Sequence, residues 1–273
     1  FVGGAWGVGP QARSCHAGLP ATPPAKGPVE PRKGKLGLHD IYARAARARA
    51  VDRNPVVVIP GILGSRLVVR ETLGSLWGDF GRTFVRPEGA GRRAVALPME
   101  HGVPLHQLRG AARPDGTLGR VSGSLLGITI RPQIYNDVLR AVGVGSYSDT
   151  YASGSAVLQG SDAEADSMAF EFDYDWRRSL DETAAQLHTF LAAASRLIRA
   201  QRRNSAPVKF DIIAHSMGGL LARYFLRYGS RPLPAVGEPP APDWAGASYV
   251  DRVLIAGTPN GGSLFALDAL TNG

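Results

Sequence analysis

The sequence predicts an α/β domain built around a mostly parallel sheet. Between residues 168 and 256, three apolar, strand-like runs alternate with two stretches that repeat apolar residues at helical spacing. Such alternation is typical of parallel strands joined by crossover helices. The chain has 273 residues, of which 44% are apolar, and this is enough to fill the core of one such domain.

The first strand is expected at Val56–Ile59, an unbroken β-branched run that ends at a Pro-Gly pair. A continuous apolar run is typical of a parallel strand buried on both faces. Residues 65–167 hold few long periodic runs, and we interpret them as a cap-like insertion. Within it, Leu125–Ile130 predicts a strand and Ile134–Val142 a helix.

Regular elements return at Met168–Tyr174, which predicts a second strand. Ser179, with Glu182 three residues later, predicts a capping box, in which two side chains bind otherwise unpaired N–H groups at the start of a helix. The helix is expected to run through Arg203, with its apolar stripe packed on the sheet.

The remaining elements complete the predicted sheet. Val208–Ala214 is expected to be a strand and Met217–Tyr228 a helix. Gly229 is expected to cap the end of that helix, and Val250–Ala256 to form the next strand.

The net charge of +8 is concentrated in residues 1–50, which contribute +6. We predict that this segment is a separate leader, with a Pro-rich linker at 17–37 and a short basic helix at 38–50, followed by one domain at 51–273. A basic leader can attract anionic lipid or nucleic acid, and the alternative is a solvated tail. We expect no nucleic-acid partner for the domain.

Composition excludes several kinds of site. Cys15 is the only cysteine, so the chain has no internal disulfide and no zinc cluster of the usual Cys/His spacing. We expect no metal and no cofactor. No run of 18 apolar residues occurs, so the sequence predicts no transmembrane helix.

Ser216 lies where the strand expected at 208–214 must turn at once into a helix. So tight a turn crowds the backbone, and the residues two before and two after the serine must be small, as Ala214 and Gly218 are. This is the nucleophile-elbow pattern, which leaves the serine hydroxyl exposed at the edge of the sheet. We predict that Ser216 is the catalytic nucleophile.

The alternative for Ser216 is an ordinary helix N-cap. The neighbouring His215 is adjacent to the nucleophile in sequence and is therefore expected to point elsewhere. We interpret it as a packed or polar neighbour of the site rather than the general base.

Gly61 and Gly64 follow the first predicted strand. Glycines permit close backbone approach and unusual φ angles, so this loop can direct a backbone N–H toward the serine. Together with the N–H of Met217, it would form an oxyanion hole. The alternative is an ordinary strand-ending turn.

Two more loops are expected at the same edge, because the carboxyl ends of parallel strands lie together. One carries Asp175, Trp176 and Arg177; we expect the Asp–Arg pair to support the floor of the pocket and the Trp to pack in the core. The other loop carries Thr258.

With these segments in order, the chain resembles the lecithin:cholesterol acyltransferase family, which includes phospholipid acyltransferases and lysosomal phospholipase. The matching stretches are PVVVIPGILGSRL (55–67), YDWRRS (174–179), AHSMGGLLAR (214–223) and VLIAGTPNGGS (253–263). The resemblance implies an α/β-hydrolase fold, three-layered (αβα), with a cap or lid and with action at a lipid interface. It also implies that the backbone N–H groups of Ile62 and Met217 form the oxyanion hole.

The sequence departs from the family pattern after the serine. The family places its triad Asp and His there, whereas no His follows His215 in this sequence. We therefore expect both groups downstream of Gly273, with the C-terminal part of the fold absent. Without a base the serine is a poor nucleophile, so this chain alone is expected to be nearly inactive.

The resulting hypothesis is a serine acyltransferase or esterase that moves an acyl group from a phospholipid-like ester through acyl-Ser216 to an alcohol or water. The alternatives are a lipase, a phospholipase or another serine ester hydrolase, and a non-catalytic lipid-binding relative. We expect a lipid or other acyl ester as partner, with membrane contact through Trp77, Phe80 and residues 125–130. An extracytoplasmic or membrane-associated location is favoured, and the oligomeric state is left open.

Overall fold

The computed structural model describes ten stretches of the chain, all within the larger of its two compact units, Leu38–Gly273. They are residues 53–78, 95–108, 110–118, 123–125, 128–130, 152–153, 157, 168–203, 205–234 and 238–272. The predictions for residues 1–50, for Phe80 and for a helix at Ile134–Val142 lie outside them.

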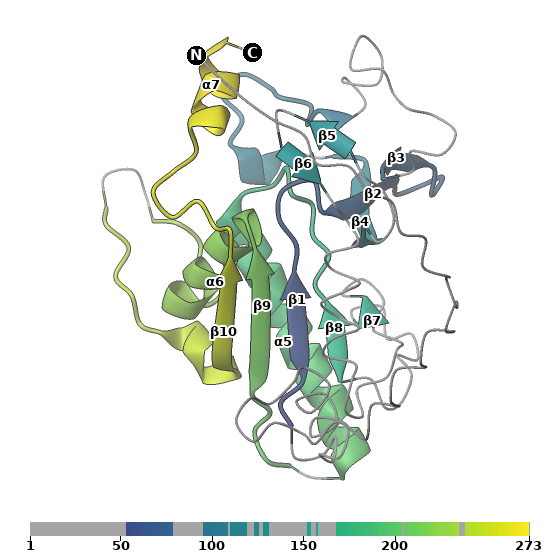
Figure 1. Ribbon diagram of the computed structural model, residues 1–273, viewed down its shortest axis with the longest axis vertical. Helices are drawn as coiled ribbons and strands as arrows, with labels where there is room; N and C mark the ends of the chain where they lie inside the picture. Colours follow the sequence, from purple (N-terminus) through teal and green to yellow (C-terminus); the bar gives the residue numbers. More distant parts are fainter. Residues whose placement is uncertain are drawn as a thin grey trace, which may run out of the picture. The chain divides into compact units, whose positions relative to one another are not determined.

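A five-stranded sheet forms the centre of this unit, in the order β10-β9-β1-β8-β7 with every neighbouring pair parallel (Figure 1). The strands are β1 (Val56–Ile59), β7 (Ala152–Ser153), β8 (Ala169–Glu171), β9 (Phe210–His215) and β10 (Val250–Ala256). β1 lies in the middle and all four of its residues are buried, which confirms the prediction from its unbroken apolar run.

Two helices, α5 (Leu180–Arg202) and α6 (Met217–Tyr228), cover the same face of the sheet (Figure 1). Their apolar residues share one core with those of the strands; Phe190 of α5 and Phe225 of α6 are fully buried there. A parallel sheet with packed helices confirms the predicted α/β character.

Most predicted bounds agree with the structure. The helix at Met217–Tyr228 and the strand at Val250–Ala256 are confirmed, and the N–H of Gly229 closes α6 on the carbonyl of Phe225 at 2.8 Å. The second predicted strand is shorter than expected, because only Ala169–Glu171 pairs with its neighbours. β9 begins two residues later than predicted and ends one residue later, at His215.

The predicted capping box is wrong in its bonding. α5 does begin directly after Ser179, but the Ser179 side chain caps no backbone N–H and its Oγ donates to Glu182 Oε2 at 3.2 Å. The reason is Arg178, which binds both oxygens of the Glu182 carboxylate at 3.1 and 2.8 Å. A charged guanidinium that donates two hydrogen bonds is a stronger partner for that carboxylate than a neutral backbone N–H.

Two small antiparallel sheets occupy the segment between β1 and β8. One has the order β3-β2-β4 and the other pairs β5 with β6. Their strands are β2 (Ser65–Val69), β3 (Ser75–Trp77), β4 (Ala112–Thr117), β5 (Gly123–Leu125) and β6 (Ile128–Ile130), with a 3-10 helix η2 at Leu105–Gln107. The single strand expected at Leu125–Ile130 is therefore wrong, because the chain folds back and pairs Leu125 with Ile128. The interpretation of this segment as a cap stays a prediction.

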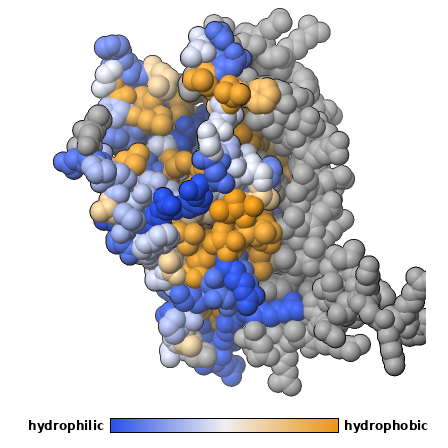
Figure 2. All heavy atoms as spheres, turned by 60° about the vertical axis from the view of Figure 1, so that its left-hand side comes forward, coloured by the Kyte–Doolittle hydropathy of each residue, from blue (hydrophilic) through white to orange (hydrophobic). Residues whose placement is uncertain are grey.

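At the other side of the sheet, a 3-10 helix η3 (Ala245–Tyr249) leads into β10, and α7 (Leu264–Asn272) follows it. Figure 2 turns this side forward and shows apolar side chains gathered on its surface. Leu254 of β10 is 61% exposed, and Leu264 and Phe265 of α7 are 83% and 64% exposed. β10 is thus an edge of the described sheet. None of the helices in the described ranges is long and apolar enough to cross a membrane.

Candidate active site

The turn from β9 into α6 holds the backbone of Ser216 at φ 51° and ψ −124°. Residues other than glycine rarely adopt this conformation. The residue is half-buried. It occupies the N-cap position of α6, but its side chain makes no capping hydrogen bond. The alternative interpretation as an ordinary N-cap therefore does not account for the strained backbone.

Three hydrogen bonds hold the Ser216 backbone in place. Its N–H donates to the carbonyl of Ala256 at 2.8 Å. Its own carbonyl accepts from the N–H of Gly219 at 3.0 Å and from Oγ1 of Thr258 at 2.8 Å. The predicted loop residue Thr258 thus contacts the elbow directly, from the loop after β10.

Glycines permit the close approach of the neighbouring loops. A Cβ on Gly218 would lie 2.5 Å from the carbonyl oxygen of Pro60 and 2.7 Å from that of Ile59. A Cβ on Gly61 would lie 2.8 Å from the Cβ of Ser216. The loop after β1 is therefore packed directly against the elbow, and only glycine fits at these two positions.

The two predicted oxyanion donors lie on these abutting segments. Ile62 is half-buried in the loop after β1, and Met217 is the first residue of α6. Within the described ranges, neither backbone N–H has a hydrogen-bond acceptor. Their assignment as an oxyanion hole stays a prediction, since it requires both groups to point at a bound carbonyl oxygen.

His215, the last residue of β9, lies between the loop after β1 and the loop after β10. Its Nδ1 is 3.2 Å from the position of a Cβ on Gly61, and its Nε2 is 3.8 Å from that of a Cβ on Gly257. Burial lowers the pKa of His215 below its ordinary value, which favours the neutral imidazole. This setting suits the packed, polar neighbour that the sequence predicts.

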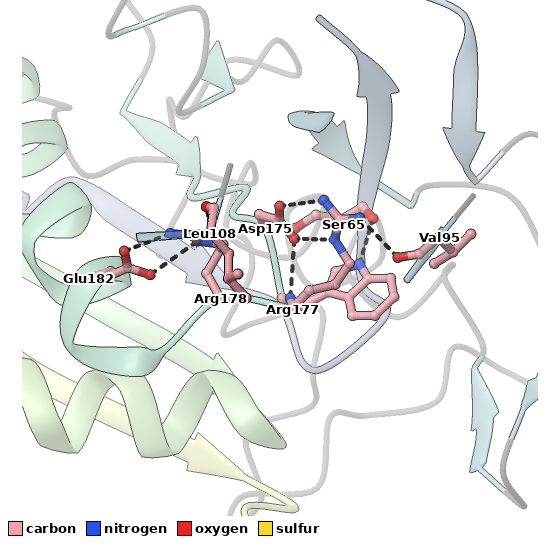
Figure 3. A network of polar contacts seen from close by, with 8 residues as sticks. Ser65, Val95, Leu108, Asp175, Arg177, Arg178 and Glu182 are labelled. Carbon is pink, nitrogen blue, oxygen red and sulfur yellow. Dashed lines mark hydrogen bonds and ion pairs between the residues drawn. The ribbon is translucent and has the colours of Figure 1, made fainter. Parts of the chain in front are cut away.

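The expected pairing of Asp175 with Arg177 is present and almost fully buried, with 11% and 7% of the two side chains exposed. Two bonds, at 2.8 and 2.7 Å, join the guanidinium to both carboxylate oxygens, and Nη1 donates to the carbonyl of Val95 (Figure 3). The pair therefore ties the loop after β8 to the segment between β1 and β8. Its function as support for a pocket floor stays a prediction.

Ser65 and Trp77 both make contacts at the loop after β1 that no pattern in the sequence predicts. Ser65 is fully buried, and its carbonyl accepts from the indole of Trp176 at 3.3 Å. Trp77 packs edge-on against Trp176, with ring centroids 5.7 Å apart, and its indole N–H donates to the carbonyl of Leu63 at 2.9 Å. Lipid contact by Trp77 stays a prediction, but replacing this residue also releases the Leu63 carbonyl.

Two buried carboxylates that the sequence does not single out, one in β8 and one just after it, bind β4. Glu171 Oε2 accepts from the N–H of Thr117 at 3.3 Å, and Asp173 Oδ2 accepts from that of Gly116 at 2.8 Å. Glu171 Oε1 is buried without a partner in the described part of the chain. Burial raises the pKa of Glu171; its bonds to Thr117 oppose this with smaller effects, and the charge of Asp173 adds the smallest increase.

This raised pKa predicts that stability falls as the pH rises. Above the ordinary carboxyl pKa of 4.5 the unfolded chain has lost the proton that folded Glu171 still holds, so ionisation progressively penalises the folded state until the raised pKa is passed. Glu171→Gln should remove this part of the pH dependence. Urea unfolding of the unchanged protein and of Glu171→Gln between pH 4 and pH 8 measures this difference. If the free energy of unfolding depends on pH in the same way in both, the prediction is contradicted.

The three aspartates that follow Ser216 bind partners outside the elbow. Asp243 pairs with Arg231 at 3.2 Å, Asp251 accepts from the side chain of Asn54 at 2.8 Å, and Asp268 accepts from Asn272. Among the residues with described positions, no three His, Cys, Asp or Glu side chains are grouped as metal ligands.

The geometry brings the four predicted loops to one edge of the sheet, since β10, β9, β1 and β8 are adjacent and parallel. These features define an α/β protein of the parallel-sheet class, with a serine of positive φ at a strand-to-helix turn. The model of the lecithin:cholesterol acyltransferase family matches residues 151–273. Over these residues the match supports an assignment to a family of that type, and the parallel sheet fits an α/β-hydrolase of that kind.

The family match includes β8, β9, α6 and β10 but not β1 or the loop that carries Ile62. It suggests a lipid acyltransferase or esterase activity in general. None of the curated proteins compared with the chain matches it.

Proposed function

We propose that the protein is a lipid-metabolising serine acyltransferase or esterase of the α/β-hydrolase fold, with the segment 65–167 as its cap. The donor is an ester, in our proposal one resembling a phospholipid, and the acceptor is an alcohol or water. The single observation that carries the proposal is the positive φ of Ser216 at the turn from β9 to α6. Such strain persists only where surrounding contacts enforce it, and it clusters at functional sites.

In the proposed reaction, Ser216 Oγ attacks the carbonyl carbon of the ester while its proton passes to a general base. The tetrahedral oxyanion accepts hydrogen bonds from the N–H groups of Ile62 and Met217. The adduct collapses, the bond to the leaving alcohol breaks, and that alcohol takes up the proton. An acceptor hydroxyl then attacks acyl-Ser216 and regenerates the serine.

The positive end of α6 supports the same chemistry. Helix N-termini favour negative charge through their unpaired N–H groups and the helix dipole, and Met217 is the first residue of this helix. The first turn contains no acidic side chain that would oppose an oxyanion.

A fluorophosphonate probe tests the proposal on the full-length protein. We expect covalent labelling at Ser216, found by peptide mass spectrometry, and loss of both labelling and ester turnover in Ser216→Ala. Ser263→Ala, in the loop after β10, is the matched control and should still be labelled. An intact fold without labelling would count against the proposal.

Product analysis with and without an added alcohol separates transfer from hydrolysis, because alcohol and water compete for the same acyl-enzyme. Acyl ester formed from the added alcohol supports the transferase, whereas free acid alone supports the lipase or phospholipase alternative. Lipid binding without either product would favour the non-catalytic relative.

A further inference from the structure

Tyr174 is a fully buried residue that binds both ends of the loop after β1. Its phenolic O–H donates to the carbonyl of Pro60 at 2.9 Å, and its backbone N–H donates to Ser65 Oγ at 3.1 Å. Tyr174 itself follows β8, the strand paired with β1 in parallel. One residue of the neighbouring loop thus spans residues 60–65.

The Pro60 carbonyl that accepts this bond also touches the elbow. It lies where a Cβ on Gly218 would come within 2.5 Å, and the next residue, Gly61, abuts the Cβ of Ser216. A displacement of Pro60 therefore shifts Ile62 relative to Ser216. The phenol thus binds at the contact between the two segments that carry the N–H groups of Ile62 and Met217.

The middle of this loop is strained and needs restraint. Leu63 has φ 64°, in a turn closed by the bond from the Gly64 N–H to the Gly61 carbonyl at 3.1 Å. A positive φ at this place in a turn favours glycine, so a leucine there is held by its surroundings. Trp77 holds the Leu63 carbonyl, and the N–H of Leu118 holds that of Gly64 at 2.9 Å.

We propose that Tyr174 is a positioning residue for acyl transfer: through the Pro60 carbonyl it fixes the distance between the Ile62 N–H and Ser216. This inference rests on the function proposed above. Tyr174 does not touch the reacting atoms; it sets the oxyanion donor in the place where charge develops. Donors of this kind act in the transition state more than in the bound substrate.

Tyr174→Phe removes one oxygen and keeps the ring that stacks on Phe172, with centroids 6.0 Å apart. We expect kcat to fall about 10-fold to 100-fold with KM unchanged, because the loss falls on an interaction made in the transition state. Binding of a trifluoromethyl ketone, which forms a tetrahedral adduct with the serine, should weaken by the same factor. Binding of a non-hydrolysable ether phospholipid should not change.

The matched control is Tyr224→Phe. It also removes a bond from a tyrosine hydroxyl to a backbone carbonyl, that of Arg231 at 2.9 Å, but away from the elbow. Its kcat should equal that of the unchanged protein.

Should Tyr174→Phe fail to fold, Ser65→Ala provides a second variant, since it removes the hydroxyl that accepts from the Tyr174 backbone N–H and should also lower kcat and not KM. If the folded variants keep the original kcat and ketone affinity, Tyr174 is only structural and the inference is wrong. If the full-length protein without substitutions neither labels at Ser216 nor turns over esters, the proposed function fails first.

Discussion

Asp175→Ala should lower the free energy of unfolding by about 3–5 kcal/mol, the loss expected when one partner of a buried ion pair is removed. The Arg177 side chain is 7% exposed and, of its partners among the described residues, would keep the carbonyl of Val95. An unpaired buried charge costs far more than the net contribution of the pair. Urea denaturation at neutral pH measures the difference.

Glu182→Ala is the control for this prediction. Glu182 also binds an arginine through both carboxylate oxygens, but 21% of its side chain and 16% of that of Arg178 are exposed (Figure 3). Removing the Glu182 carboxylate should lower the free energy of unfolding by about 1 kcal/mol. Replacing both members of the buried pair, as Asp175→Leu with Arg177→Met, should cost less than Asp175→Ala alone. Equal losses for the two single variants would contradict the prediction.

Gly218→Ala should lower the free energy of unfolding by about 3 kcal/mol and slow probe labelling of Ser216 by about 100-fold. The added Cβ would meet the carbonyl oxygens of Pro60 and Ile59 at 2.5 and 2.7 Å, and these backbone atoms cannot rotate away. Helix propensity alone would predict the opposite change in the free energy of unfolding, since alanine is normally preferred to glycine within a helix.

Gly261→Ala is the matched control in the loop after β10. A Cβ there would meet nothing within 4 Å, and the residue does not have a positive φ. It should leave both stability and labelling within experimental error. Labelling of Gly218→Ala at the original rate would show that the elbow tolerates movement of the loop after β1.

Local patterns in the sequence were sufficient to predict most regular elements around the site. The apolar run of β1, the helix after Ser216 and the strand at Val250–Ala256 are where periodicity and the Pro and Gly positions indicate. The predicted nucleophile is found at a strand-to-helix turn for the same reason: its small neighbours allow a turn that larger residues would prevent.

Local patterns in the sequence did not predict which partners the polar side chains bind. The pattern of Ser179 and Glu182 predicts a capping box, yet Arg178, one residue earlier, takes the Glu182 carboxylate. Lipid contact by Trp77 stays a prediction, and no local pattern indicates the bond from its indole N–H to the carbonyl of Leu63. Tyr174 begins the YDWRRS stretch at 174–179, but its bond to Pro60 joins residues 114 positions apart in the chain, so local patterns do not predict it.

The α/β class, the position of the strand-to-helix turn and the small residues around Ser216 follow from local sequence, because they depend on neighbours within a few residues along the chain. The contacts that hold this turn come from long-range packing: Pro60 lies against Gly218, Thr258 donates to the Ser216 carbonyl, and Tyr174 binds the loop after β1. A buried polar group binds whichever partner the fold brings within hydrogen-bond distance, so local patterns do not predict these bonds. Parallel strands bring together residues that lie far apart in the chain.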